Sequence, residues 1–273
     1  MIMRWRRVLF PRRYLTMKIS VDPFNELGSV EKVPGLKQRF PDRVLIMTSD
    51  KCFGYCEHCT RKHILGRSSV VDTPEKLRAS LSYVKARPLI RDVLLSGGDF
   101  LTLDDKKVAM FIDAFASLKQ IEIIRVCTRA LVTNPKRITP RLVKILSRSK
   151  KVWVNCHINT AEEVAIASKA AARLVDGGLP VSSQTVLLRG VNDDKDKMLA
   201  LLKALSAARI RPYYVFQCDP VKGVYERFAV PLRRAKAIEK YCAEHIGGLS
   251  LPRFVADLPG AKRKTPLSAL SSS

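Results

Sequence analysis

The sequence predicts an α/β fold, a full or partial βα barrel in which parallel strands lie inside and helices lie outside. Seven short runs rich in Val, Ile and aromatic residues alternate with segments of helical spacing, and the connections between them are short. The strand-like runs are almost continuously hydrophobic, which is typical of strands buried on both faces. Six or seven such units favour a barrel over an open doubly wound sheet.

The individual elements follow from composition and from residues typical of helix ends. Thr73-Pro74 and Thr139-Pro140 each combine an N-cap residue with Pro at the first helical position. Asp176-Gly177-Gly178 predicts the end of an alanine-rich helix that begins near Ala161. The predicted strands are residues 43–49, 92–98, 122–128, 152–159, 181–188, 213–219 and 253–257.

Polar residues follow most of these strands. In a parallel βα barrel, the residues just after each strand meet at one rim, where catalysis usually occurs. We therefore expect a single site at that rim. Its candidate members are the cysteine loop at 52–59, Gly97-Gly98-Asp99, Arg129, His157, Gln184, Asp219 and residues 257–264.

The charge balance limits the classes of function. Lys and Arg number 49 against 25 Asp and Glu, which gives a formal net charge of +24. Such an excess favours polyanions, so nucleic-acid binding is one interpretation. However, the cations are spread along the chain and no aromatic-rich RNA motif accompanies them. A basic enzyme with anionic ligands is the favoured interpretation, and no apolar run approaches the ~20 residues of a membrane-spanning helix.

Cysteine usage indicates the compartment. Outside the 52–59 loop the cysteines are isolated (Cys127, Cys156, Cys218 and Cys242), which is no disulfide framework and predicts a reducing, cytoplasmic setting. The first 20 residues are basic and contain no acid before residue 20. Three interpretations stay open for them: an organelle presequence, a basic arm, or a start codon placed upstream of Met17.

The loop Cys52-Phe-Gly-Tyr-Cys56-Glu-His-Cys59 follows the first predicted strand with the spacing C-x3-C-x2-C. Three thiolates on one loop can hold three irons of a four-iron cluster and leave the fourth iron without a protein ligand. S-adenosylmethionine (SAM) can chelate that open iron. The competing interpretation is structural zinc, for which His63 would complete a Cys3His set. Ser96-Gly97-Gly98-Asp99 favours the cluster, because small residues let a backbone approach the methionine end of the cofactor.

Further motifs occur in order along the chain, at residues 41–45, 60–61, 94–99, 137–140, 154–159, 186–193, 211–214, 217–219, 257–260 and 264–266. Together with the cysteine loop they resemble the lysine 2,3-aminomutase family of radical SAM enzymes, over roughly residues 22–266. The resemblance implies a barrel of the radical SAM type at 41–266 that ends in a pyridoxal phosphate (PLP) lysine segment. Residues 1–40 would be a basic arm and lead-in, and 267–273 a tail.

The resemblance also implies roles in binding the cofactors. Lys264, in the final Lys-Thr-Pro motif, would form the Schiff base with PLP as the catalytic lysine. Arg43 would contact the PLP phosphate. His157 and Gln184 would contact SAM, and His58 would lie along its adenine. Cys52, Cys56 and Cys59 would hold the [4Fe–4S] cluster, and Ser96, Gly97, Gly98 and Asp99 would cradle the methionine end of SAM.

Substrate roles follow in the same way. Arg61 would pair with the substrate carboxylate, since a guanidinium fork matches a carboxylate. Asp219 and Asp257 would hold the distal ammonium of lysine. The resemblance therefore implies an isomerase that converts L-lysine to β-lysine. We expect a reduced flavodoxin or ferredoxin as electron donor and a homo-oligomeric assembly.

The sequence also leaves alternative functions open and differs from the family pattern at several positions. One alternative is an arginine-type 2,3-aminomutase, and another is the shorter relative that acts on lysine in elongation factor P modification. A non-enzyme alternative is a basic nucleic-acid-binding protein with a zinc loop. The long family members carry terminal regions absent here, so assembly could differ. Asp194 stands where zinc-binding members have a cysteine, so no structural zinc is expected, and Phe216 stands where tyrosine is common.

Overall fold

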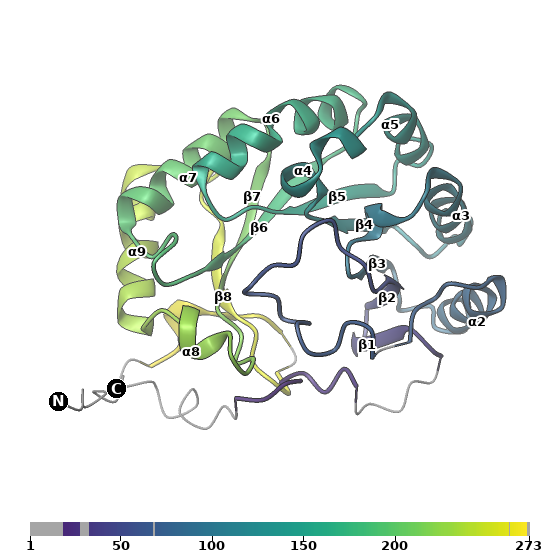
Figure 1. Cartoon of the computed structure of the whole chain (residues 1–273), viewed down its shortest axis with the longest axis horizontal. Helices are drawn as coiled ribbons and strands as arrows, with labels where there is room; N and C mark the ends of the chain where they lie inside the picture. The colour runs from purple at the N-terminus through teal and green to yellow at the C-terminus, as the bar shows by residue number, and fades with distance from the viewer. Residues whose placement is uncertain (1–18, 28–32, 68, 262, 272–273) are drawn as a thin grey trace.

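The computed structural model describes residues 19–27, 33–67, 69–261 and 263–271. Most of the predicted basic arm therefore lies outside the described residues. The described part is a nine-stranded sheet in the sequential order β1 to β9, with helices outside it (Figure 1). No helix in the described ranges is long and apolar enough to cross a membrane.

Strands β2 to β8 are parallel, while β1 and β9 pair antiparallel at the two edges. The sheet is not closed, so the predicted barrel is a partial one. The strands are β1 (Leu36–Phe40), β2 (Arg43–Ser49), β3 (Asp92–Gly97), β4 (Ile123–Thr128), β5 (Val152–His157), β6 (Val181–Leu187), β7 (Arg211–Gln217), β8 (Arg253–Ala256) and β9 (Thr265–Pro266).

The helices cover the outside of this sheet in chain order (Figure 1). Three predicted helix ends are confirmed: the Thr73 and Thr139 hydroxyls accept from backbone N–H groups, and the alanine-rich helix ends at Asp176. The helices are α2 (Pro74–Lys85), α3 (Asp105–Ala116), α4 (Ala130–Thr133), α5 (Pro140–Leu146), α6 (Ala161–Asp176), α7 (Lys195–Ala207), α8 (Tyr225–Phe228) and α9 (Leu232–His245).

The two faces of the parallel strands differ. Side chains such as Val126 and Val154 are fully buried against the helices and belong to the hydrophobic core. The opposite face carries Arg125, Asn155 and His157, which are only partly buried and line a cavity. The expectation of strands buried on both faces is therefore wrong for the inner face, where polar side chains surround space for ligands.

The open side of the barrel is bridged by side chains and by a short N-terminal segment. Arg39 of β1 donates to the carbonyl of Leu258 at 2.6 Å, beyond the end of β8. Residues 19–27, which we call the strap, run between the chain after β7 and strand β1 (Figure 1). Ser20 forms an isolated parallel bridge with Val221, and Lys37 donates to the carbonyl of Glu26. The strap thus spans the gap that the sheet leaves open.

Candidate functional site

A cavity of about 970 Å³ lies against the inner face of the partial barrel. Because most of the predicted site residues follow successive parallel strands, they were expected to meet at one rim. The cavity is lined by every residue to which the sequence assigned a site role: Arg43, Cys52, Cys56, His58, Cys59, Arg61, Ser96, Gly97, Gly98, Asp99, His157, Gln184, Asp219, Asp257 and Lys264. Their proximity is a finding, whereas their individual roles remain predictions.

The cysteine loop lies directly after β2 and is folded by its own turns. Cys59 N–H donates to the carbonyl of Cys56 at 3.2 Å, and all three loop cysteines are free and partly buried. Burial raises the pKa of the Cys52 thiol to about 12, with Asp99 adding to the effect. Such a thiol becomes a thiolate when a metal replaces its proton.

His63, the fourth ligand of the zinc interpretation, is not among the residues that line the cavity with the three cysteines. Its Nε2 lies 2.8 Å from the carbonyl of Lys222, on another loop. In the described ranges, no three His, Cys, Asp or Glu side chains converge on a point that could hold one metal ion. A four-iron cluster does not require that convergence, because each cysteine binds a different iron.

The glycine pair packs the end of β3 against the start of the cysteine loop. Gly97 has φ +113°, and a Cβ on Gly98 would lie 2.3 Å from the carbonyl oxygen of Lys51. Asp99 N–H donates to that same carbonyl at 2.7 Å. Only glycine allows this approach, so the motif fixes the loop that carries the cysteines.

Asp99 joins three segments of the rim. Its carboxylate accepts hydrogen bonds from the Thr128 hydroxyl at 2.7 Å, from Arg129 N–H at 2.8 Å and from Leu101 N–H at 3.0 Å. Burial raises its pKa, while these donors oppose that shift. The side chain therefore holds the ends of β3 and β4 together beside the cavity.

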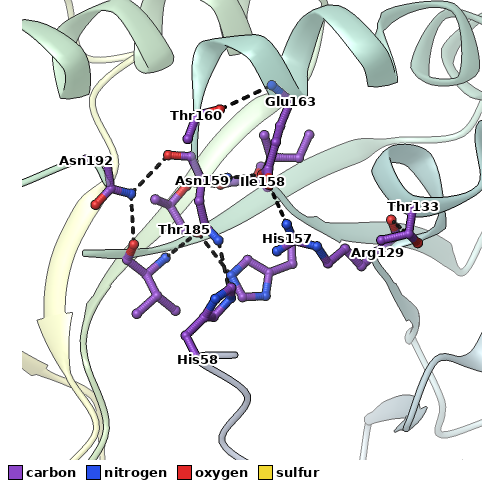
Figure 2. Close-up of polar contacts among 12 residues, drawn as sticks. His58, Arg129, Thr133, His157, Ile158, Asn159, Thr160, Glu163, Thr185 and Asn192 are labelled. Carbon is purple, nitrogen blue, oxygen red and sulfur yellow. Dashed lines mark hydrogen bonds and ion pairs between the residues drawn. The ribbon is translucent and has the colours of Figure 1, made fainter. Parts of the chain in front are cut away.

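Two histidines face each other across the rim, and Asn159 holds both (Figure 2). The rings of His58 and His157 pack edge to face with centroids 5.1 Å apart. Asn159 Oδ1 lies 3.1 Å from His157 Nε2, and its Nδ2 lies 3.3 Å from His58 Nε2. Because Asn159 Oδ1 also accepts from Val186 N–H, its amide orientation is fixed. With its proton on Nε2, His157 keeps an acceptor at Nδ1 that no described residue hydrogen-bonds, and Gln184 is the register neighbour of His157 on β6.

The histidine pair is uncharged at neutral pH. Burial lowers the pKa of His58 to about 4, and the positive charge of Arg129 acts in the same direction. Burial also lowers the pKa of His157, with a contribution from His58. Two neutral imidazoles offer hydrogen bonds and ring faces without repelling a sulfonium cation.

Arg129 is a site residue whose role the sequence did not assign. It pairs with Glu163 through Nη2, and that glutamate accepts from Asn159 N–H at 2.7 Å (Figure 2). Its Nη1 is buried without a hydrogen-bond partner in the described structure. A buried guanidinium with an unused donor beside a cavity is suited to a carboxylate ligand. Its position directly after a strand was the only sequence signal.

Lys264 and the two predicted substrate acids lie together at the cavity. Lys264 Nζ forms an ion pair with Asp257 Oδ2 and lies 5.3 Å from the centre of the Phe216 ring. Arg39 Nη1 approaches the other oxygen of Asp257 at 2.8 Å. Asp257 is thus already neutralised by protein cations.

Asp219 is in a different electrostatic situation. It accepts a hydrogen bond from Thr60 at 2.9 Å and has no cation at ion-pair distance in the described structure. Burial raises its pKa to about 7, and the negative charge of Asp257 contributes. Thr60 follows Cys59 directly, so this hydrogen bond joins the acid to the cysteine loop.

Two arginines with predicted roles have protein partners. Arg61 forms a bidentate pair with Glu26 of the strap, from Nε at 2.7 Å and Nη2 at 2.8 Å. Arg43 lies over the Phe40 ring at 4.3 Å and near Asp42 at 3.5 Å. Neither Glu26 nor the contact of Arg39 with Asp257 was expected from sequence.

Comparison with known proteins supports the interpretation of the cysteine loop. A family model described as the Radical SAM superfamily matches residues 46–202. The chain belongs to the radical SAM superfamily. An L-lysine 2,3-aminomutase from Acetoanaerobium sticklandii is 42% identical over 90% of this chain and 59% of its own length. One from Fusobacterium nucleatum is 41% identical over 90% of this chain and 58% of its own length.

The predicted resemblance is therefore confirmed at the level of the family. The radical SAM chain spans less than two thirds of the length of these two relatives. A Streptococcus suis protein, SuiB, solved with its precursor peptide SuiA, has a TM-score of 0.60 and 18% identity, covering 80% of this chain and 49% of SuiB. That likeness supports the partial barrel fold alone.

The donor set of this radical SAM chain fits the cofactors of its superfamily, a [4Fe–4S] cluster and SAM. Three cysteines on one loop line the cavity, and the glycine pair positions that loop. The neutral histidines and the unused Arg129 donor lie on the same rim. For PLP, Lys264 and Arg43 line the same cavity, so both predicted contacts are within one enclosure.

Proposed function

We propose that the chain is an isomerase that moves the α-amino group of L-lysine to the β-carbon. The observation that carries this proposal is the union of two groups of residues in one cavity. Thr60 of the cysteine loop donates to Asp219, and Asp219 lies near the Asp257–Lys264 pair. A site for radical generation and an acidic site for a cationic side chain are thus in direct contact.

The cofactors would supply the chemistry that side chains lack: a strong hydrogen-abstracting radical from cluster and SAM, and an electron-delocalising carrier from PLP. Cys52, Cys56 and Cys59 would hold the cluster. His58, His157, Gln184 and the segment Ser96–Gly97–Gly98–Asp99 would hold SAM, and Arg129 would receive its carboxylate. Lys264 would hold PLP, and Arg43 would contact its phosphate.

The acids decide for a cationic substrate. At ~4 Å and an effective dielectric of ~20, each carboxylate attracts an ammonium by about 4 kcal/mol before desolvation. An acidic side chain would be repelled to the same degree. In the described residues Asp219 has no cation at ion-pair distance, and Asp257 would become available when Lys264 turns toward PLP. Arg61 would bind the α-carboxylate at the opposite end of the substrate.

We also infer the setting in which the enzyme works. All seven cysteines are free, which suits the reducing cytoplasm. A reduced flavodoxin or ferredoxin would deliver the electron to the cluster, and the protein would act as a homo-oligomer. We also propose a division into a lead-in at 1–40, which ends in the edge strand β1, a barrel at 41–266 and a tail at 267–273.

One anaerobic experiment tests the proposal. The reconstituted protein is analysed for iron and sulfide, and then incubated with SAM, PLP, dithionite and L-lysine, L-arginine or L-glutamate. We expect about four irons per chain and conversion of L-lysine to β-lysine by mass spectrometry, with little turnover of L-glutamate. Faster turnover of L-arginine than of L-lysine would change the assigned substrate from lysine to arginine. Normal iron content without turnover of any of the three would refute the mutase activity and leave the cluster assignment intact.

A further inference from the structure

Glu26 lies on the strap, outside the motifs that predicted the site, yet it contacts a predicted substrate residue. Its carboxylate accepts from Arg61 Nε at 2.7 Å and from Nη2 at 2.8 Å. Both side chains are largely enclosed, with exposed fractions of 18% for Glu26 and 19% for Arg61. A bidentate pair in such a position is strongly oriented, because both partners have lost most of their hydration.

The pair uses only one edge of the guanidinium. Arginine has five N–H donors, and the side-on edge is formed by Nε and one Nη2 hydrogen. The end-on edge, formed by Nη1 and the second Nη2 hydrogen, remains. In the described structure Nη1 has no hydrogen-bond partner, and Arg61 lines the cavity. That edge can accept a second carboxylate in the same planar geometry.

The backbone of Glu26 is held in place by hydrogen bonds within the strap and to β1. The Asp22 carboxylate accepts from the backbone N–H groups of Glu26 at 2.8 Å and Leu27 at 2.6 Å. The Glu26 carbonyl accepts from Lys37 of β1, and Ser20 bridges to Val221 at the other end of the strap. These contacts hold the backbone of Glu26 through both its N–H and its C=O group. The Glu26 side chain can therefore limit the rotation of the Arg61 guanidinium that it binds.

We propose that Glu26 is a positioning residue that orients Arg61 so that its end-on edge receives the α-carboxylate of the amino acid substrate. This inference rests on the proposed substrate role of Arg61 and adds the residue that makes it geometrically specific. Burial raises the pKa of Glu26, but the charge and hydrogen bonds of Arg61 together with the charges of Lys37 and Arg39 outweigh it, so the pKa is lowered and the carboxylate remains ionised at neutral pH. Without the Glu26 carboxylate, the Arg61 guanidinium would rotate and lose its planar alignment with the substrate carboxylate.

The opposite interpretation is that Glu26 competes with the substrate for Arg61. The two interpretations predict opposite signs for the same substitution. Glu26→Gln preserves size but removes the charge and one acceptor. If Glu26 positions Arg61, the KM for L-lysine rises about tenfold with kcat changed less than about threefold, as expected for loss of one oriented charged hydrogen bond. If it competes, the KM falls.

A double-mutant cycle shows whether the effect passes through Arg61. Glu26→Gln should raise the KM in the wild-type background and change it little in an Arg61→Lys background. Glu26→Asp, which keeps the charge on a shorter arm, should lie between. The matched control is Glu122→Gln, which breaks an exposed pair with Arg91 away from the cavity and should leave the KM unchanged. Equal effects of Glu26→Gln in both backgrounds would overturn the proposal.

A second readout needs no turnover. The rate at which phenylglyoxal modifies Arg61 is followed by peptide mass spectrometry, with L-lysine or propionate as the protecting carboxylate. In the wild type both should slow the reaction, and in Glu26→Gln about tenfold more of each should be needed. Protection by propionate but not by L-lysine would refute the lysine assignment and keep the positioning role. Unchanged or stronger protection in Glu26→Gln would overturn that role.

Discussion

Asp219→Asn should stabilise the substrate-free protein at pH 8 and weaken its binding of L-lysine. Burial and the charge of Asp257 raise the pKa of Asp219 from 3.8 to about 7. An acid whose folded pKa lies above its unfolded value destabilises the fold when ionised. The contribution of protonated Asp219 to the free energy of unfolding is therefore complete below about pH 4 and is lost as the pH rises to about 7. The difference of about 3 pH units corresponds to about 4 kcal/mol at pH 8, an upper limit because the carboxylate faces the cavity.

The same shift predicts how substrate binding depends on pH. A bound ammonium favours the ionised form of Asp219, so below about pH 7 binding must displace a proton. The KM for L-lysine should therefore fall about tenfold per pH unit as the pH rises toward 7, and then level off. The asparagine variant carries no such proton, so its KM should be higher and nearly independent of pH in this range. The KM for SAM should not change.

The assay compares denaturant unfolding of wild type and variant at pH 6 and pH 8 in the absence of substrate. The stability gap should widen by about 1.4 kcal/mol between the two pH values, because the wild type loses its remaining proton in that interval. Asp113→Asn, which changes an exposed acid on α3, is the control and should show no such widening. An Asp219→Asn protein no more stable than wild type at pH 8, or one that keeps the KM slope, would refute the reasoning.

Three further outcomes are expected. Lys264→Ala should abolish the borohydride-sensitive absorbance band of the PLP-loaded protein with iron content unchanged; a surviving band would mean that another lysine holds PLP. Cys56→Ala should lose most of the bound iron, whereas Cys242→Ala, a buried cysteine of α9, should keep it; equal iron in both would contradict the cluster assignment. Gly98→Ala should lower stability by about 1–3 kcal/mol in thermal unfolding because its Cβ would meet the Lys51 carbonyl at 2.3 Å; an unchanged transition would show that the loop yields.

The buried strands could be predicted because their hydrophobic runs are unambiguous. The range predicted at 43–49 coincides with β2, and the range predicted at 253–257 extends one residue beyond β8. Strand β7 begins earlier than predicted, at Arg211, although Pro212 cannot donate to a ladder. The register shifts between Ser183 and Gln184 on the neighbouring strand, and such an irregularity accommodates proline.

The antiparallel edge strands were not predicted. β1 has the sequence LKQRF, in which only the first side chain is buried. An edge strand of this kind is held by backbone pairing and carries no hydrophobic run, so its sequence resembles a loop. β9 has only two residues and is defined by its pairing with β8.

The positions of the site residues were accessible from sequence, whereas their protein partners were not. A residue that directly follows or ends a strand can be placed at the rim from the sequence alone, as His157, the last residue of β5, illustrates. The partner of Arg61 comes from 35 residues upstream, and the carbonyl partner of Arg39 lies 219 residues away. Contacts over such separations depend on how the open barrel is closed, which no local pattern encodes.

The distribution of unpaired groups in the cavity has a physical logic. Most cavity cations are balanced within the protein, as Arg129 is by Glu163 and Lys264 is by Asp257. In the described structure, three cavity side chains still have an unused group: Nη1 of Arg129 and the end-on edge of Arg61 lack a hydrogen-bond partner, and the carboxyl of Asp219 has no cation at ion-pair distance. Leaving them unpaired costs stability in the free protein. The SAM carboxylate would pair with Arg129, and the α-carboxylate and side-chain ammonium of lysine would pair with Arg61 and Asp219. Binding of these ligands would therefore stabilise the folded protein at the groups that lack partners in their absence.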